Sequence, residues 1–363
     1  MGDAEPRRIL IWLPNWVGDV AMATPALRAL RERFRSSHIA YVGRPAAVQL
    51  LESAPWTDET IEDRSGGCPV AAMGLALRLR KARFELAVLL PNSFRTAAVA
   101  WLAGARRIAG YARDSRGWML TDKLLPPRDE RGRLSPVPAI EYYANLAALL
   151  GADCADRRMT LPLRDADAAA AEEELRRAGA DLARPIVMLN PGAAFGSSKM
   201  WEEGRYAAVA DALIERRGAQ IVVNAAPSER AIAARVVAAM KHKPLLHFAG
   251  RDNTLGLLKG LLARSTLLVT NDTGARHVAA ALGAAVVTLF GSTDPRWTRI
   301  DYARERIVRV DVPCSPCQQK RCRLPAGPTF HQCMTAITPE MVLAAAEELL
   351  DAPAGPRGGG PAA

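Results

Sequence analysis

The sequence lacks a long apolar run, a secretory leader and the glycine fingerprint of a dinucleotide site. Its longest nearly uncharged apolar stretch runs only from Val278 to Phe290, whereas a membrane-spanning helix needs roughly 20 such residues. Acidic residues at positions 3, 5 and 19 interrupt the start of the chain before an apolar signal segment can form. No Gly-x-Gly-x-x-Gly follows an apolar run, which argues against an NAD-dependent dehydrogenase. We therefore expect a cytoplasmic protein without a membrane span.

Aromatic residues make up only 6% of the chain, while Lys and Arg outnumber Asp and Glu by 48 to 38, a net charge of +10. A surplus of this size favours an anionic partner, such as a nucleic acid, an acidic membrane face or a phosphorylated substrate. The basic residues are scattered, and few aromatic residues are present to stack on bases. We therefore expect no nucleic-acid partner, and we keep a basic zinc-knuckle nucleic-acid-binding protein as the non-enzyme alternative.

Short apolar runs alternate with longer segments of helical period along the whole chain. In the first half, the pattern predicts strands over 8–13, 39–42 and 86–90 and helices over 25–34, 70–81 and 95–102. In the second half, it predicts strands over 186–189, 221–223, 245–248, 267–269 and 285–290, and helices over 206–216, 231–240, 255–263 and 275–282. Regular alternation of this kind is typical of parallel sheets covered on both faces, the α/β class.

The alternation breaks in the middle of the chain, where an Ala/Glu/Arg helix with few large apolar residues follows Leu161-Pro162-Leu163. We expect an N-terminal Rossmann-like domain over 1–165, a linker over 166–184 and a second Rossmann-like domain over 185–351. The Gly/Pro/Ala-rich tail 352–363 is expected to be disordered. Two doubly wound domains facing across a cleft would bind their ligands at the carboxyl ends of the strands.

The first informative loop follows the strand predicted at 8–13 and ends at Gly18-Asp19, where a helix begins. A carboxylate at a helix N-terminus is stabilised as the anion. Asp19 is therefore either a simple helix cap or a general base, which must be ionised to act. Asn15 and Trp16 precede it in the same loop.

A second loop, 190–201, follows the first predicted strand of the second half and contains Gly192, Ser198 and Lys199. It does not match the phosphate-binding loop Gly-x-x-x-x-Gly-Lys-Ser/Thr, because no glycine directly precedes Lys199. A lysine in a Gly/Ser-rich loop after a strand is still a plausible phosphate contact. The alternative is a solvated loop lysine.

A third loop, 270–280, follows the strand predicted at 267–269 and enters a helix. Asp272 or Thr273 is expected to cap this helix, which would leave the amides near Gly274 as an anion site suited to a diphosphate. His277 lies one turn into the helix, where it either contacts the ligand or packs in the core.

A cysteine cluster, Cys314-x2-Cys317-x4-Cys322-x10-Cys333, lies near the C-terminus. It holds one Cys-x-x-Cys knuckle but not a second, so the spacing does not fit a standard zinc finger. A structural zinc ion held by these four residues is one interpretation, and free thiols in a basic loop are the other.

Taken together, these segments resemble glycosyltransferase family 9, the ADP-heptose lipopolysaccharide heptosyltransferases, and within it the type II enzymes. The motifs that carry the resemblance are Trp16-Val17-Gly18-Asp19, Leu90-Pro91-Asn92-Ser93-Phe94-Arg95, Asn190-Pro191-Gly192-Ala193, Lys199-x-Trp201 and Asn271-Asp272-Thr273-Gly274-x-x-His277. The resemblance implies the GT-B fold, an inverting mechanism and no catalytic metal. It also implies transfer of L-glycero-D-manno-heptose from ADP-heptose to the heptosyl-Kdo2-lipid A inner core, at the inner-membrane surface. Another family 9 activity, of type I or III or on a different acceptor, is the alternative.

The resemblance also assigns roles by position. It implies a catalytic base at Asp19, a donor-phosphate lysine at Lys199 and a nucleotide-sugar site built from Gly192, Ser198, Glu229, Asp272, Thr273, Gly274 and His277. Donor binding leaves the basic residues of the first half without a role, so we assign the acceptor to Asn15, Trp16, Arg95 and Arg113. The chain departs from the type II pattern at Ala194, where Glu is usual, and in the 224–229 segment, which lacks the usual glycine.

Overall fold

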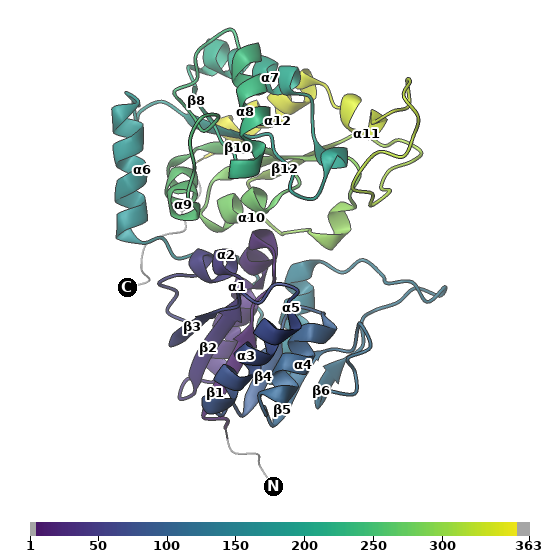
Figure 1. The fold of residues 1–363 in the computed structure, drawn as a ribbon. Helices are drawn as coiled ribbons and strands as arrows, with labels where there is room; N and C mark the ends of the chain where they lie inside the picture. The colour runs from purple at the N-terminus through teal and green to yellow at the C-terminus, as the bar shows by residue number, and fades with distance from the viewer. Residues whose placement is uncertain (1–4, 354–363) are drawn as a thin grey trace. The chain divides into compact units, whose positions relative to one another are not determined.

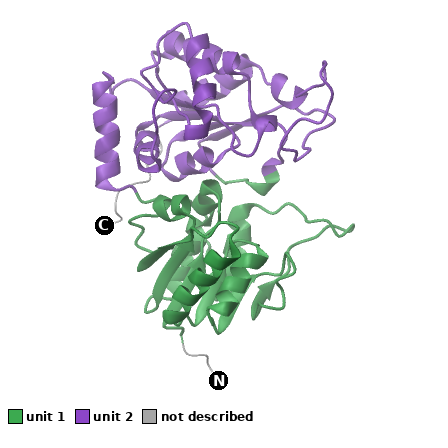
Figure 2. Cartoon of the chain, viewed as in Figure 1, with its two compact units in different colours: residues 1–162, 296–301 green, residues 163–295, 302–363 purple. Residues whose placement is uncertain are grey.

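The computed structural model describes residues 5–353, which form two compact units (Figure 2). The first unit runs to Pro162 and takes in Arg296–Asp301; the second comprises Leu163–Pro295 and the chain from Tyr302 onward. In the part of the chain that is described, no helix is long and apolar enough to cross a membrane.

The first unit is built on a six-stranded parallel sheet in the order β3-β2-β1-β4-β5-β6. Its strands are β1 (Arg8–Trp12), β2 (His38–Gly43), β3 (Glu59–Glu62), β4 (Leu86–Leu89), β5 (Arg107–Tyr111) and β6 (Asp122–Leu124). Its helices are α1 (Val17–Arg33), α2 (Pro45–Leu50), α3 (Pro69–Lys81), α4 (Phe94–Leu102) and α5 (Ala139–Leu149). Helix α1 packs on α2 and α5, while α3 and α4 pack side by side over the sheet (Figure 1).

Helix α1 begins at Val17, close to the helix start expected at Gly18-Asp19 but earlier than the helical run predicted over 25–34, and carries Pro25 in its interior. A proline has no N–H, so the carbonyl of Ala21 one turn earlier loses its helical partner. The Thr24 hydroxyl donates to that carbonyl at 2.7 Å and takes the missing place. The helix therefore continues through the proline, and Asp19 lies in its first turn.

The second unit repeats the plan with the order β12-β11-β10-β7-β8-β9, again all parallel. Its strands are β7 (Ile186–Asn190), β8 (Gln220–Val223), β9 (Leu246–His247), β10 (Leu267–Asn271), β11 (Ala285–Phe290) and β12 (Glu305–Arg309). Its helices are α6 (Asp165–Arg177), α7 (Glu203–Arg217), α8 (Arg230–Ala239), α9 (Leu255–Arg264), α10 (Gly274–Ala281), α11 (Gln332–Thr335) and α12 (Pro339–Asp351). Two single turns complete it, η1 (Ser197–Lys199) and η2 (Pro227–Glu229), while a third, η3 (Pro295–Trp297), lies where the chain passes into the first unit.

The segment 166–184, predicted to be a linker, belongs instead to the second unit, because α6 packs tightly against α9. The contact uses small residues: a side chain on Gly260 would approach the Asp167 carbonyl oxygen to 2.5 Å, and Ala171 beside it is fully buried. A close helix pair of this kind needs no large apolar side chains. The scarcity of such side chains in α6 is what led to the prediction of a linker. The predicted disordered tail lies outside the described residues from position 354 onward.

Candidate active site

In both units, the informative loops follow the two central strands at the point where the strand order reverses. The reversal lies between β1 and β4 in the first unit and between β7 and β10 in the second. In open α/β sheets, the loops at such a switch point diverge and leave a crevice at the carboxyl ends of the strands. The predicted motifs therefore occupy the binding position of each unit.

In the second unit, Lys199 is fixed at the start of α10 by Asp272. The lysine Nζ donates to the Asp272 carboxylate at 2.6 Å and to its carbonyl oxygen at 2.9 Å. Burial alone would raise the pKa of the Asp272 carboxyl, but the charges of Lys199 and Arg276 outweigh it and lower that pKa. The Thr293 hydroxyl also donates to this carboxylate, at 2.9 Å. Asp272 is therefore ionised and holds a cation at the switch point.

The helix start itself is not capped by a side chain, contrary to the prediction for Asp272 or Thr273. Thr273 is the N-cap residue, yet its hydroxyl accepts from Asn190 Nδ2 at 3.2 Å rather than from an α10 amide. Because the first amides of a helix have no partner within the helix, those from Gly274 onward remain available for an anion beside Lys199.

His277 lies in the next turn of α10 and is almost fully buried, with 3% of its surface exposed. Burial, with the nearby charge of Arg276, lowers the pKa of the imidazole to about 3, so the ring is neutral near pH 7. Its Nδ1 has no hydrogen-bond partner among residues 5–353. A buried nitrogen without a partner is costly, which makes His277 a candidate ligand contact rather than a simple core residue.

Glu229 lies directly on the backbone of Gly192. A side-chain carbon on Gly192 would be 2.0 Å from the Glu229 Oε2, so only glycine permits this approach. Burial raises the pKa of the Glu229 carboxyl, although the amides of Ala226 and Ala193 oppose the shift. The structure thus brings Glu229 to the loop that carries Gly192, as a shared site requires; its predicted role in the nucleotide-sugar site stays a prediction.

Ser198, predicted to bind the donor, is occupied within the protein. Its hydroxyl donates to the Gln319 carbonyl and accepts from Ser292 at 3.0 Å, and its own carbonyl meets His331 Nε2 at 2.9 Å. The Ser198 amide donates to the Lys320 carbonyl at 3.1 Å. These bonds tie the Lys199 loop to the cysteine-rich segment, and the predicted contact of Ser198 with the donor stays a prediction.

The four clustered cysteines lie near one another. Burial, followed by the neighbouring thiols of Cys314, Cys317 and Cys322, raises the pKa of Cys333 to about 11. Within residues 5–353, however, no group of three or more His, Cys, Asp or Glu side chains is arranged to hold a metal. The arrangement therefore does not support the predicted zinc site, which stays a prediction, and the visible role of the segment is to brace the Lys199 loop.

In the first unit, Asp19 lies beside a tyrosine that the sequence analysis did not single out. The Tyr143 hydroxyl donates to Asp19 Oδ1 at 3.5 Å. Burial, with the charge of Asp19, holds the pKa of Tyr143 well above its usual value, so the phenol keeps its proton. Asp19 is half-buried in the first turn of α1, where the helix dipole favours the ionised carboxylate.

The loop after β4 is held by a buried arginine, Arg116, that the sequence analysis also missed. Its guanidinium is fully buried and donates to the carbonyls of Pro91 at 2.5 Å and Ser93 at 3.3 Å. Burial lowers the pKa of Arg116 to about 10. Asn92, between these two carbonyls, accepts from the Tyr142 hydroxyl at 3.0 Å. A rigid polar loop is thus placed opposite the loop that leads to Asp19.

The predicted acceptor residues differ in exposure and in whether their side chains already have partners within the protein. Trp16 is 61% exposed and Arg113 is half-buried beside Tyr142, whose pKa it lowers against the raising effect of burial. Asn15 is half-buried in the loop before α1. Arg95, in contrast, is already paired: its guanidinium donates to the Asp63 carboxylate at 2.5 Å.

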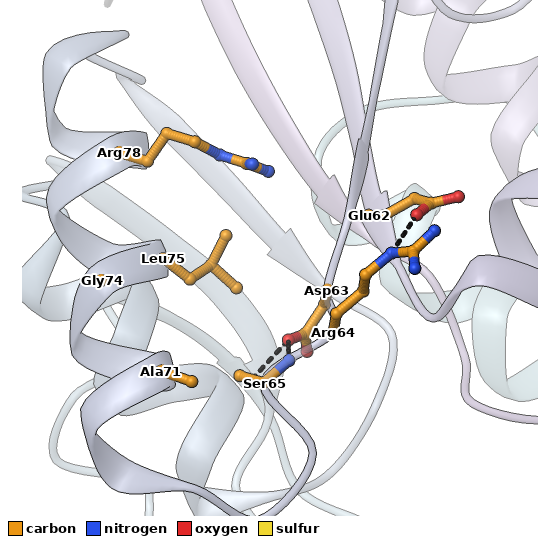
Figure 3. A pocket seen from close by; sticks show the side chains of 8 residues that line it. All are labelled: Glu62, Asp63, Arg64, Ser65, Ala71, Gly74, Leu75 and Arg78. Carbon is orange, nitrogen blue, oxygen red and sulfur yellow. Dashed lines mark hydrogen bonds and ion pairs between the residues drawn. The ribbon is translucent and has the colours of Figure 1, made fainter.

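Asp63 and Ser65 form the inner edge of a cavity of about 360 Å³ between the end of β3 and α3 (Figure 3). Ser65 donates to Asp63 through its amide at 3.0 Å and through its hydroxyl at 2.5 Å, and its hydroxyl accepts from Arg95 at 2.7 Å. Burial would raise the pKa of Asp63, but the bonds from Arg95 and Ser65 lower it. Arg95 is therefore bonded to Asp63 and Ser65 while its side chain stays 31% exposed, and its predicted contact with the acceptor stays a prediction.

Residues 73–326 match the profile of glycosyltransferase family 9 (heptosyltransferase). The chain belongs to this family. It is 28% identical to lipopolysaccharide heptosyltransferase 2 of Salmonella typhimurium, over 94% of this chain and 98% of that protein. Among solved structures, it is similar to Escherichia coli ADP-heptose lps heptosyltransferase II (TM-score 0.74, 27% identity, 94% and 98% covered). A family 9 protein from Veillonella parvula shares the fold with a TM-score of 0.79 and 24% identity, over 95% of this chain and 97% of that one.

The family and the double α/β fold predicted from the motifs are thus confirmed. For this family 9 chain, the structure brings Lys199, Asp272 and the α10 amides together at the start of α10, and Glu229 with Gly192 in the adjacent loop. It also places Asp19 with Tyr143 at the first switch point. Tyr143, Arg116 and Arg276 were missed because their importance comes from burial and contacts, which spacing does not reveal.

Proposed function

We propose that this family 9 enzyme is a cytoplasmic heptosyltransferase II that works at the inner-membrane surface. In this proposal, it moves L-glycero-D-manno-heptose from ADP-heptose to a phosphorylated lipid A inner core that already carries one heptose. The observation that carries the proposal is Lys199, held by Asp272 at the start of α10. The names of the relatives supply the donor sugar and the type of acceptor.

The donor diphosphate fits the second unit. As the glycosidic bond breaks, negative charge grows on the departing ADP, and groups already aimed at that charge stabilise the transition state. The Lys199 ammonium and the α10 amides from Gly274 onward provide such groups. Neutral His277 adds a ring nitrogen that can bond to the ligand without bringing a charge.

The acceptor step fits the first unit. Asp19 accepts the proton of the acceptor hydroxyl, whose oxygen attacks the anomeric carbon as the ADP oxygen leaves from the opposite side. One displacement of this kind inverts the configuration and needs no covalent intermediate with the protein. Tyr143 keeps its proton and donates to Asp19, so it orients the carboxylate rather than competing as a base.

The direct test incubates the purified protein with ADP-heptose and defined truncated core acceptors, followed by mass spectrometry of the products. We expect addition of one heptose to the acceptor that carries a single heptose, and release of ADP. Transfer to Kdo2-lipid A without heptose would instead indicate the type I activity. ADP-heptose binding without transfer to any lipid A core would contradict the proposal.

We expect transfer to persist in excess EDTA, because Lys199 and the α10 amides carry the leaving-group charge. The measurement is the initial rate before and after brief chelation, with the metal content determined in parallel. Loss restored by Mg²⁺ or Mn²⁺ would contradict the proposed mechanism. Loss restored only by Zn²⁺ would show that the cysteine segment binds a structural ion.

Replacing Arg113 with Gln should raise the KM for the phosphorylated acceptor by about 10- to 150-fold while the KM for ADP-heptose stays unchanged, since one charge-assisted bond contributes roughly 1.5–3 kcal/mol. Arg95→Gln is the informative comparison. It leaves Asp63 unpaired inside the protein, so it should lower the melting temperature. An effect of Arg113→Gln on the donor alone would show that the acceptor assignment is wrong.

A further inference from the structure

Helix α3 presents apolar side chains to solvent on one face. Val70, Met73 and Leu77 are 80%, 45% and 55% exposed, and their spacing of three and four residues places them on one side of the helix. The opposite side of α3 is already buried, with Leu75 and Leu79 in the core against the sheet. The exposed apolar stripe is thus not part of the hydrophobic core of this unit.

Helix α4, which packs beside α3, continues the pattern (Figure 1). Phe94 and Trp101, seven residues apart on one side of α4, are 48% and 53% exposed. Trp118, 68% exposed, lies edge-on to Trp101 with ring centres 6.1 Å apart. Single exposed apolar residues are common, but a cluster of large ones marks an interaction surface. We call Val70, Met73, Leu77, Phe94, Trp101 and Trp118 the α3–α4 face.

The two helices that carry this face are basic and contain no acid. The stretches 69–84 and 94–107 have no Asp or Glu. Among residues 5–353, none of the following exposed cations of these stretches has a carboxylate partner: Arg78, Arg80, Lys81, Arg83 and Arg106. Figure 3 shows Arg78 extending from α3 beside Leu75, over the cavity that Glu62 and Asp63 also line. Arginines elsewhere in this unit are often paired, for example Arg28 with Asp156.

We propose that the α3–α4 face docks on a membrane surface that contains anionic phospholipid. Tryptophan and aliphatic side chains enter the boundary between headgroups and acyl chains, while long basic side chains contact the phosphates. A second copy of the chain is a poor occupant, because its matching face would bring the same positive charge. Charge complementarity therefore selects an anionic surface.

Docking through this unit would hold Asp19 and the acceptor loops close to a lipid-linked acceptor. That consequence rests on the proposed function, but the docking itself does not, since it needs neither donor nor acceptor. Holding an enzyme on the surface where its substrate is anchored raises the effective concentration of that substrate.

The test is flotation of the purified full chain with vesicles, without substrates. We expect binding to vesicles of phosphatidylglycerol and phosphatidylcholine in equal parts, release at high salt, and little binding to pure phosphatidylcholine. The double variant R80Q/K81Q should bind about 25-fold more weakly, because each basic residue near an anionic surface contributes about fivefold. The matched control K241Q/K243Q removes two exposed lysines of the second unit and should bind like the wild type.

A second variant, L77S/W101S, should weaken vesicle binding by about tenfold, because it removes apolar area that the membrane buries. Both changed side chains are about half exposed, so melting temperatures should fall only slightly, mainly through loss of the Trp101–Trp118 contact. Equal weakening by the lysine control, or equal binding to both vesicle types, would overturn the proposal. So would a dimer that L77S/W101S abolishes, because the occupant would then be a second copy. Transfer to a deacylated, water-soluble acceptor should be unchanged in R80Q/K81Q, which separates docking from the proposed activity.

Discussion

Asp19→Asn should reduce heptose transfer by about 10²–10⁴-fold, the usual effect of losing a general base. The carboxyl group lies in the first turn of α1, where the helix dipole favours the anion that can accept a proton, and it is beside a protonated tyrosine. The amide is nearly the same size but does not accept a proton at neutral pH. ADP-heptose affinity, measured by calorimetry, should barely change, because the donor residues belong to the second unit.

Two controls separate catalysis from helix capping. Loss of the negative charge at the start of α1 should lower the free energy of unfolding by only about 0.3–1 kcal/mol. Tyr143→Phe removes the hydrogen bond to Asp19 but leaves the carboxylate, so it should reduce the rate far less than Asp19→Asn. If Asp19→Asn transfers heptose within a few-fold of the wild-type rate, Asp19 is only a cap.

The sequence was sufficient to predict the two α/β units and the loops of the site, because buried parallel strands are continuous apolar runs and the motif loops follow them directly. It was insufficient where small residues do the packing. Helix α6 was assigned to a linker because its contact with α9 uses Ala171 and Gly260 in place of large side chains. The helical pattern was recognised only over 25–34, whereas α1 runs through Pro25 from Val17, because Thr24 supplies the bond that lets the helix continue.

Within the site, the motifs predicted the position of a side chain better than the role of that side chain. Lys199 and Glu229 lie in the loops where the motifs placed them. Ser198 and Arg95 were assigned to ligands, yet both have partners contributed by distant segments, the cysteine-rich loop and the end of β3. Buried positioning residues such as Arg116 carry no sequence signal of their own, since an arginine after a strand looks like any surface arginine.

Lys199→Met should lower kcat/KM for transfer by about 10²–10³-fold, comparable to the loss of one preorganised donor to a developing negative charge. The change also removes the main partner of the buried Asp272 carboxylate. Removing one member of a buried ion pair costs about 3–5 kcal/mol, and here Arg276, 3.7 Å from the carboxylate, offsets part of that cost. The single variant should therefore lose both activity and stability. On its own, it does not show how much of the lost activity comes from the missing cation.

The double variant K199M/D272N separates these two losses. It removes the unpaired charge together with the lysine, so its melting temperature should recover most of what K199M loses. Its transfer rate should stay low, because Lys199 is gone and the remaining cation, Arg276, is fully buried and paired with Glu305. Calorimetry should show weak ADP binding in both variants, in line with their low transfer rates. Recovery of transfer in K199M/D272N would show that Lys199 acts only by neutralising Asp272, and the proposed stabilisation of the leaving group would then have to come from the helix start alone.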